Sequence, residues 1–251
     1  SSIMPAHLPN LNDRVALVTG GSRGIGRAIS IALAAAGASV AVNYRQRGNE
    51  AAGVVAEIER AGGRAIAVRA DVSVADDVKA MFREVENHLG LIDVLVNNAG
   101  TGTIVDIDDL TEAEFDRTLA VNLKSAFLCT QAALPGMRAR HWGRIVNLSS
   151  AAARGAGLLG VHYNASKAGV EGLTRGYAAK LAREGITVNA VAPGPIDTEM
   201  AGPLKAANVA DKLPVGRLGE ASEVAQAVLM VVGNAFITGQ TIPVNGGVSF
   251  I

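Results

Sequence analysis

Tyr163 and Lys167 are the two side chains in this sequence whose types and spacing best suit acid–base chemistry. A spacing of four residues places both side chains on one face of a helix. A free phenol has a pKa of about 10, and a nearby ammonium group lowers that pKa because it favours the phenolate. Ser150 lies 13 residues before the tyrosine and follows the apolar run Arg144–Leu148, so its hydroxyl would stand at a strand end. Taken singly, these residues are better explained as an exposed Tyr–Lys pair and a serine that caps a turn.

A glycine-rich stretch, Thr19–Gly26, has the composition of a phosphate-binding turn. It follows the β-branched run Val15–Thr19 and opens a helical pattern at Gly24–Ala36. Glycines let the backbone turn sharply and approach a pyrophosphate closely, and the free N–H groups at a helix start face the anion. Because this turn is the first strand-to-helix connection of the chain, it predicts dinucleotide binding.

The same stretch also satisfies G-x-S-x-G, the nucleophile-elbow pattern of serine hydrolases, with Ser22 as the nucleophile. That function requires an acid and then a histidine later in the chain. The histidines, at positions 7, 88, 141 and 162, all precede the last third of the sequence. A serine hydrolase is therefore a disfavoured alternative from a different class. A cofactor-binding regulator without turnover is disfavoured as well, because Ser150, Tyr163 and Lys167 are all present.

Short β-branched runs alternate with longer Ala-rich helical patterns along the chain. Runs that are almost continuous in Val, Ile, Leu and Ala are typical of parallel strands covered by helices on both faces. The alternation predicts an α/β fold with a single-domain, Rossmann-like, doubly wound and mainly parallel seven-stranded sheet, with helices on both faces. The predicted strands are 15–19, 39–43, 65–69, 92–96, 144–148, 187–191 and 240–244. The predicted helices are 24–36, 50–61, 75–89, 112–137, 164–183 and 222–232.

Composition and charge exclude several classes of protein. Hydrophobic residues make up 49% of the 251 residues and Lys+Arg 23 balance Asp+Glu 23, so we expect a folded, soluble chain that binds neither nucleic acid nor a membrane. The single cysteine, Cys129, excludes an internal disulfide and a Cys-rich zinc site; we expect no metal and a cytoplasmic location. We expect residues 1–12 to be an N-terminal extension, with 1–3 left from an expression tag. Residues 13–251 should form one dinucleotide-binding and catalytic domain, with a substrate lid at about 193–220.

Further residues complete a pattern that resembles the short-chain dehydrogenase/reductase superfamily. The resemblance extends from Asp13 to Gly247 and is closest to the 3-oxoacyl-[acyl carrier protein] reductases and carbonyl reductases. The motifs that carry it are Thr19–Gly26, Asp71-Val72, Asn97-Asn98-Ala99-Gly100, Asn122, Ser150, Tyr163 with Lys167, and Pro193-Gly194 with Thr198.

The resemblance implies four catalytic residues. Tyr163 would be the acid/base, and Lys167 would lower its pKa and hold the nicotinamide ribose. Ser150 would polarise the carbonyl oxygen, and Asn122 would help to hold a water-linked proton relay from Lys167. The positions expected to bind the cofactor are Gly20, Ser22, Arg23, Gly24, Ile25, Gly26, Asn43, Tyr44, Arg45, Asp71, Val72, Asn98, Ala99, Gly100, Tyr163, Lys167, Pro193, Gly194, Ile196 and Thr198.

The end of the second predicted strand favours NADP(H) over NAD(H). An acidic residue about 20 residues after the glycine loop normally binds the ribose 2′-hydroxyl of NAD. Here that strand ends in Val42-Asn43-Tyr44-Arg45, without a carboxylate, and Arg23 lies in the glycine loop. Guanidinium groups bind phosphate through charge-assisted hydrogen bonds. The alternative is that Arg45 and Arg47 only solvate a loop.

The substrate is less well defined by the sequence. Small residues follow Ser150, and Leu158, Leu159 and Met200 would give an aliphatic pocket suited to an apolar ketone. We expect reversible reduction of a 3-oxoacyl thioester or a related ketone, with a sugar or secondary-alcohol dehydrogenase as the alternative. The resembling reductases dock an acidic acyl carrier protein on basic residues, for which Arg140 is a candidate here. A position that is basic in some of them is Glu184 in this chain. The resemblance also implies a homotetramer.

Overall fold

The structure, a computed structural model, describes residues 9–250; most of the expected N-terminal extension, including the suggested tag remnant, lies outside the described residues. Seven parallel strands form one sheet in the order β3-β2-β1-β4-β5-β6-β9. The predicted α/β, doubly wound, seven-stranded fold is therefore confirmed. The strands are β1 (Val15–Val18), β2 (Ser39–Tyr44), β3 (Ala65–Arg69), β4 (Val94–Asn97), β5 (Gly143–Leu148), β6 (Ile186–Pro193) and β9 (Thr241–Val244).

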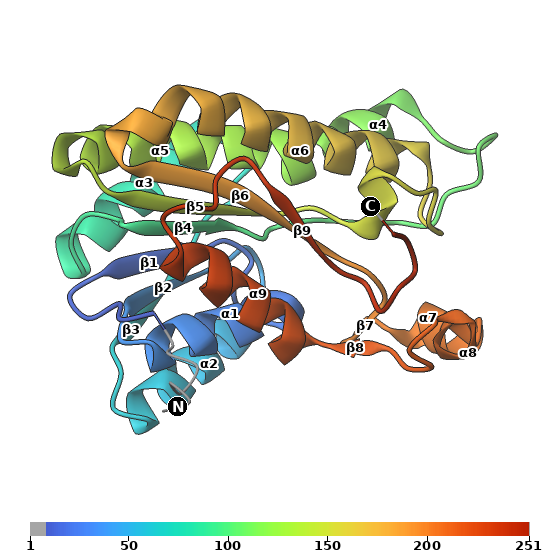
Figure 1. The fold of residues 1–251 in the computed structure, drawn as a ribbon, viewed down its shortest axis with the longest axis horizontal. Coiled ribbons are helices and arrows are strands. Elements are labelled where there is room, and N and C mark those ends of the chain that lie inside the picture. Colours follow the sequence, from blue (N-terminus) through green and yellow to red (C-terminus); the bar gives the residue numbers. More distant parts are fainter. Residues whose placement is uncertain (1–8, 251) are drawn as a thin grey trace, which may run out of the picture.

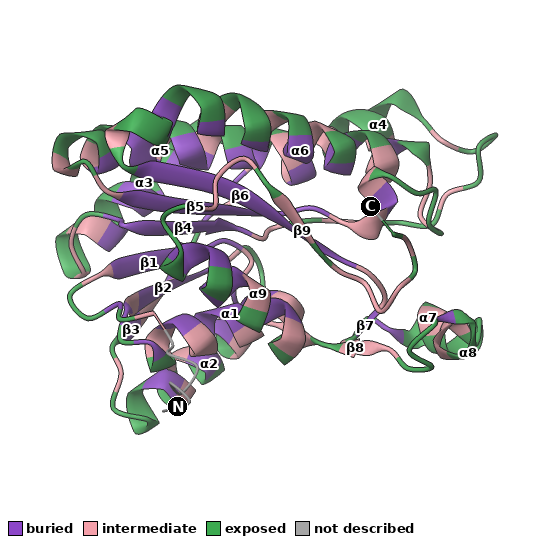
Figure 2. Ribbon diagram, in the orientation of Figure 1, coloured by how far each residue is buried: buried purple, intermediate pink, exposed green. Residues whose placement is uncertain are grey.

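Helices cover both faces of this sheet (Figure 1). One face packs against α1 (Gly24–Ala35), α2 (Gly48–Arg60) and α9 (Ala221–Gly233). The other packs against α3 (Ala75–His88), α5 (Ser125–Arg140) and α6 (Val161–Leu181). The central strands β1, β4 and β5 are buried along their whole length (Figure 2), which explains why their sequences are apolar without alternation.

The predicted helix 112–137 is in fact three consecutive elements. These are α4 (Glu112–Leu119), a π-helical turn (Ala120–Lys124) and α5. The apolar pattern continues through the turn, so the sequence did not reveal the change in winding. Asn122 lies within the π-helical turn and is only 3% exposed. π-helical turns often occur at functional sites, where they redirect a side chain.

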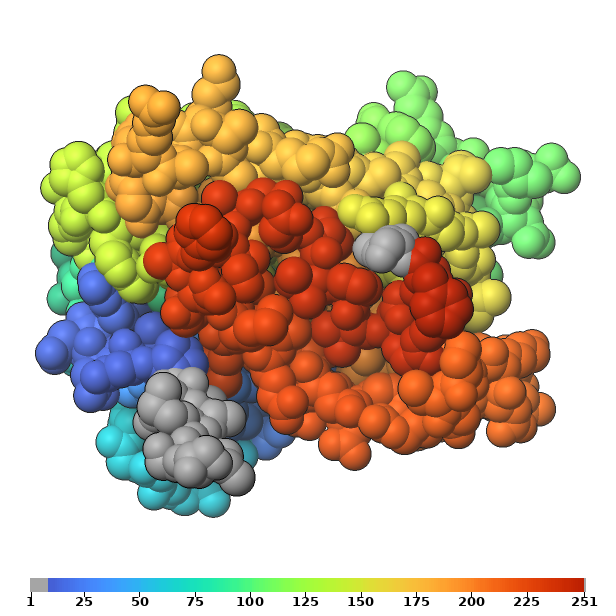
Figure 3. Space-filling model, viewed as in Figure 1, coloured from blue at the N-terminus to red at the C-terminus, as the bar shows by residue number. Residues whose placement is uncertain are grey.

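The segment 193–220 has more structure than its sequence suggested. It contains β7 (Ile196–Asp197), α7 (Gly202–Ala206), α8 (Val209–Lys212) and β8 (Gly219–Glu220). The two short strands pair in parallel, which joins the two ends of the segment. The segment projects from the end of the molecule reached by β6, and in Figure 3 the last residues of the described chain lie against it. Among residues 9–250, no helix is long and apolar enough to cross a lipid bilayer.

Candidate active site

The carboxyl ends of the parallel strands gather the predicted functional residues at one edge of the sheet. Gly20 follows β1, Asn98 follows β4, Ser150 follows β5, and Pro193 ends β6. In open α/β sheets this edge is where ligands bind. The segment 193–220 leaves the sheet from the same edge.

The glycine loop is packed so closely that side chains would not fit. Gly20 has a φ of +59°, and a Cβ atom there would lie 3.0 Å from the Ala99 Cα atom. A Cβ at Gly26 would overlap the carbonyl oxygen of Gly20 and lie 2.5 Å from Asn98 Nδ2. Asn98 Nδ2 also donates to the carbonyl oxygens of Thr19, at 3.1 Å, and of Gly20, at 2.9 Å. These contacts form a cradle at the start of α1 that a pyrophosphate group fits.

Asn43, predicted as a cofactor ligand, supports this loop from the interior. It is 2% exposed, and its Oδ1 atom accepts a hydrogen bond from Gly20 N at 3.1 Å. Its Nδ2 atom donates to the carbonyl oxygens of Val68 and Ala70, both at 3.3 Å. Because its side chain is committed to the protein interior, Asn43 holds the shape of the loop and offers no side-chain group to a ligand.

Other predicted cofactor residues lie around the same cradle. A Cβ atom at Gly24 would lie 3.6 Å from Thr198 Cγ2, so the beginning of the 193–220 segment touches the glycine loop. Ser22, Val72, Pro193 and Ile196 are buried, and Arg23, Ile25, Tyr44, Ala99 and Gly194 are partly buried.

A cavity of about 490 Å³ opens beside the ends of β2 and β3. Two of the predicted cofactor residues, Arg45 and Asp71, line it. Arg69, which the sequence reasoning missed, lines it too and donates from Nε to the Arg45 carbonyl oxygen at 3.2 Å. Both arginines are exposed, and neither has an ion-pair partner within residues 9–250. Asp77 lines the cavity as well, so two guanidinium groups, which suit a phosphate, lie there beside two carboxylates.

Ser150, Tyr163 and Lys167 converge where β5 meets α6. The Ser150 Oγ atom accepts from Ala152 N at 3.1 Å, which caps the 3-10 turn Ala151–Ala153, and the Ser150 hydroxyl lies near enough to Tyr163 to act on its pKa. Burial raises the pKa of Tyr163, and the neighbouring Ser150 hydroxyl partly offsets that rise. Lys167 Nζ lies 5.8 Å from the centre of the Tyr163 ring and donates to Leu148 O at 2.9 Å. Burial lowers the pKa of Lys167 to about 8.

Asn122 completes the group by fixing the loop after β4. Its Oδ1 atom accepts from Thr101 N at 2.7 Å, and its Nδ2 atom donates to Thr101 O at 2.9 Å and Ser166 Oγ at 3.1 Å. A Cβ atom at Gly100 would lie 3.5 Å from Asn122 Oδ1 and 3.7 Å from Lys167 Nζ. The structure therefore brings all four predicted catalytic residues together, beside the end of the glycine cradle.

Comparisons with known proteins agree with this arrangement. The family model described as "short chain dehydrogenase" matches residues 14–209. The chain is 44% identical to 3-oxoacyl-[acyl-carrier-protein] reductase FabG of Staphylococcus aureus, over 92% of this chain and 96% of that protein. It is 43% identical to 3-oxoacyl-[acyl-carrier-protein] reductase of Synechocystis sp., over 94% of this chain and 97% of that protein.

A solved structure is similar over almost the whole chain. A blue fluorescent protein from a metagenomic library, in complex with NADPH, superimposes with a TM-score of 0.89 at 39% identity, over 96% of this chain and 100% of that one. The matched region contains the glycine loop, Asn122, Ser150, Tyr163 and Lys167. The serine hydrolase alternative is therefore wrong, and the chain belongs to the short-chain dehydrogenase family of oxidoreductases, which act on alcohol and carbonyl groups with a nicotinamide cofactor.

Proposed function

We propose that this protein is an NADPH-dependent carbonyl reductase that converts ketones, including 3-oxoacyl thioesters, into secondary alcohols and catalyses the reverse reaction. The observation that carries the proposal is that Ser150, Tyr163 and the buried Lys167 lie together at the edge of the sheet where ligands bind. The glycine cradle would hold the pyrophosphate of a bound dinucleotide, and the arginine-lined cavity would hold its 2′-phosphate.

The proposed chemistry adds a hydride to the carbonyl carbon and a proton to the carbonyl oxygen. The nicotinamide ring, when bound, supplies the hydride. Ser150 donates a hydrogen bond to the carbonyl oxygen, and Tyr163 transfers its phenolic proton to that oxygen as negative charge develops there. Since burial raises the pKa of Tyr163, a nearby positive charge is needed to make the phenolate accessible, and Lys167 is placed to provide it. Asn122 holds Thr101 and, as we propose, one end of a water-linked path that returns a proton to Lys167.

A panel of ketones tests the reaction class. NADPH oxidation should be observed with small apolar ketones and 3-oxoacyl thioesters. Exposed aliphatic side chains in the two segments expected to form the pocket favour these substrates over polyhydroxylated sugars: Leu158, Val161 and Met200. Turnover of sugars but of no ketone would contradict the proposal and favour the sugar dehydrogenase alternative.

NADPH should be preferred to NADH, and Arg45→Asp should reduce that preference. A charge-assisted hydrogen bond to the 2′-phosphate contributes roughly 1.5–3 kcal/mol, or about 10- to 150-fold in affinity. The carboxylate would in addition repel the phosphate and accept the 2′-hydroxyl of NADH. The measurement is kcat/KM with both cofactors. Arg47→Asp is the matched control, because Arg47 is also exposed in this loop but pairs with Glu50 at 3.0 Å. An unchanged NADPH/NADH ratio in the Arg45 variant would refute this role.

An acyl carrier protein is the proposed macromolecular partner, but the surface charges oppose strong docking. Glu184 accepts two hydrogen bonds from Arg138, at 2.6 and 2.9 Å, which neutralises that arginine. Arg140, the arginine suggested by the sequence, is committed to Asp93 and the Ile92 carbonyl oxygen. A homotetramer and a cytoplasmic location remain predictions.

Attaching the substrate to an acidic carrier should therefore increase kcat/KM only modestly. Glu184→Arg should enlarge that increase at low salt, because it replaces the neutral Arg138–Glu184 pair by two positive charges that attract the acidic carrier. Steady-state kinetics with free and carrier-linked 3-oxo substrates, at low and high salt, measure the effect. The free substrate is the internal control and should be insensitive to the substitution. A large carrier effect in the unmodified protein that the substitution diminishes would contradict this interpretation.

A further inference from the structure

A buried carboxylate one helical turn beyond Lys167 has no part in the chemistry proposed above. Glu171 lies on α6 and is only 5% exposed. Its two oxygen atoms have different partners: Oε1 accepts from Ser149 Oγ at 3.1 Å, and Oε2 accepts from Arg154 Nε at 3.1 Å. Burying a carboxylate is costly unless it is both paired and hydrogen-bonded, so these two contacts together fix where this side chain lies.

The two partners of Glu171 lie on either side of Ser150 in the chain. Ser149 directly precedes Ser150, and its backbone N–H donates to Val191 O at 2.8 Å on the neighbouring strand β6. Arg154 follows Ser150 by four residues, at the end of the 3-10 turn that Ser150 caps. One carboxylate on the helix that carries Tyr163 and Lys167 therefore binds the segment carrying Ser150 at two points.

We propose that Glu171 is a positioning residue that holds the Ser150 hydroxyl at working distance from Tyr163. The proposal rests on the carbonyl reductase function proposed above. Ser150 follows a strand and Tyr163 lies on a helix, so only contacts between the two elements set the separation of their hydroxyl groups. The Glu171 contacts join α6 to the segment that follows β5. One of them, with Arg154, is the single ion pair between these two parts of the chain within residues 9–250.

A neighbouring contact limits how large the effect should be. Asn164 Nδ2 donates to the carbonyl oxygens of Ala152, Gly155 and Ala156, so α6 has a second attachment to the same segment. Loss of the Glu171 contacts should therefore displace Ser150 slightly without releasing the segment. A displacement of about 1 Å at a reacting group costs up to about 100-fold in rate.

Glu171→Gln tests the proposal with almost no change in side-chain size. The amide group has one acceptor oxygen instead of two, so it cannot accept from both Ser149 and Arg154; Ser149 Oγ then keeps only the Lys167 carbonyl oxygen, at 3.4 Å, or Arg154 Nε has no acceptor. We expect kcat for ketone reduction to fall about 10- to 100-fold. NADPH affinity, measured by fluorescence titration, should change less than about threefold, because the glycine cradle makes no contact with Glu171.

A double-mutant cycle with Ser150→Ala separates positioning from general destabilisation. If Glu171 acts through Ser150, its substitution should cost less than about twofold in kcat once the serine hydroxyl is absent, because residues that act as a unit are not additive. An equal loss of kcat in both backgrounds, or no loss in the unmodified background, would overturn the proposal.

The pKa of Tyr163 gives a readout that needs no substrate. The Ser150 hydroxyl lowers this pKa, so both Ser150→Ala and Glu171→Gln should raise it in an ultraviolet titration from which the Tyr163→Phe signal is subtracted. If the protein reduces no ketone, the proposed function fails while this titration still decides the role of Glu171. An unchanged Tyr163 pKa in Glu171→Gln would overturn that role.

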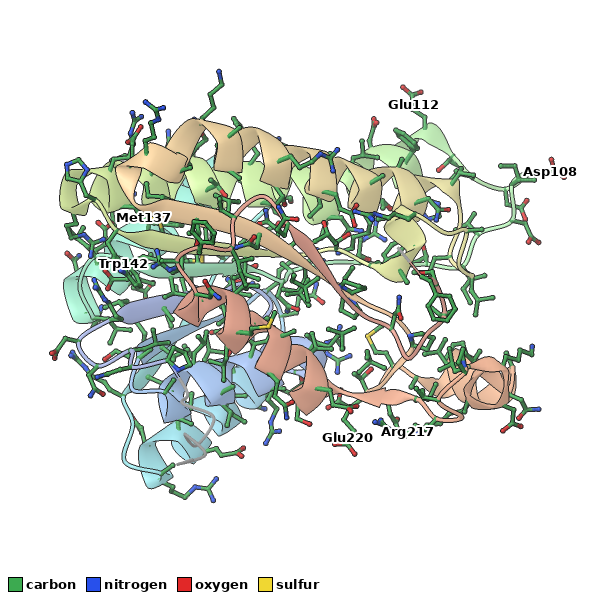
Figure 4. The ribbon with its side chains drawn as sticks, in the orientation of Figure 1. Asp108, Glu112, Met137, Trp142, Arg217 and Glu220 are labelled. Carbon is green, nitrogen blue, oxygen red and sulfur yellow. The ribbon has the colours of Figure 1, made fainter. Side chains whose placement is uncertain are left out.

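Asp93→Asn is the matched control for loss of a buried carboxylate. The Asp93 side chain is 4% exposed, pairs with Arg14 and Arg140, and accepts from Val15 N at 2.8 Å. Arg14 stacks on Trp142, which Figure 4 places far from Arg217 and Glu220 of the 193–220 segment. Asp93→Asn should lower the melting temperature but leave kcat and the Tyr163 pKa unchanged. Equal effects of Asp93→Asn and Glu171→Gln on kcat and the Tyr163 pKa would show that Glu171 has only a structural role.

Discussion

Replacing Tyr163 by phenylalanine should lower kcat for ketone reduction by about 10²–10⁴-fold, which is the usual loss when a positioned general acid is removed. The phenylalanine ring keeps the packing of α6 but has no proton to give to the developing alkoxide. NADPH affinity should change less than about threefold, because the glycine cradle and the arginine-lined cavity are untouched. Single-turnover absorbance of NADPH and a binding titration measure the two quantities separately.

Tyr177→Phe is the control for this substitution. Tyr177 lies on the same helix, and its hydroxyl donates to Gln131 Oε1 at 2.8 Å in an exposed position away from Ser150. The same chemical change there should leave kcat within about twofold. If the Tyr163 variant retained more than about a tenth of the original kcat, another group would have to supply the proton.

The fold was predictable because its signal is repeated along the chain. Each buried strand is a short apolar run, each helix shows its own longer pattern, and the order of the two determines a parallel sheet. The pairing of β1 with both β2 and β4 follows from right-handed crossovers, which leave few arrangements. The sequence pattern did not reveal the change from α-helical to π-helical winding between α4 and α5. The π-helical turn at Asn122 accompanies that residue's bonds to Thr101, which is distant in sequence.

The candidate site was predictable where motif residues lie at strand ends or one helical turn apart. Tyr163 and Lys167 share a helix face, and the glycine loop is continuous in sequence. The missed residues depend instead on contacts between elements. Arg69 meets Arg45 because β2 and β3 pair with Tyr44 opposite Arg69, and this register cannot be obtained from either strand alone. Glu171 follows Lys167 at the same helical spacing, but its importance depends on Ser149 and Arg154 reaching it.

Asn43 shows the opposite case, in which the sequence did not reveal the direction of a side chain. The sequence placed it at the end of β2, among residues expected to contact the cofactor. In the structure its side chain is buried and accepts a hydrogen bond from Gly20 N. Successive side chains along a strand point to opposite faces of the sheet, so the face on which Asn43 lies decides what it can contact. A strand that is buried on both faces has no polar–apolar alternation, so its sequence does not show which side chains lie on which face.

Gly26→Ala should weaken NADPH binding by roughly 10- to 150-fold, the equivalent of losing one charge-assisted hydrogen bond to a phosphate. The added methyl group would overlap the Gly20 carbonyl oxygen and press on Asn98 Nδ2, so the cradle must open. Overpacking of this kind costs about 1–3 kcal/mol, and the backbone N–H groups would move away from the pyrophosphate. A fluorescence titration with NADPH measures the loss directly.

Gly53→Ala provides the matched control, because Gly53 also lies in a helix but has no atom within 4 Å of an added Cβ. Alanine is a better helix former than glycine by about 1 kcal/mol, so this variant should be as stable as the unmodified protein or more stable, with unchanged NADPH affinity. Helix propensity does not disfavour alanine at Gly26 either, so a loss specific to Gly26→Ala reflects the steric effect at the loop. Equal NADPH affinity in both variants would mean that the close approach of α1 to the loop is not needed for cofactor binding. A loss confined to Gly26→Ala would instead show that the cradle depends on the close approach of α1 to Gly20 and Asn98, which only a residue without a side chain allows.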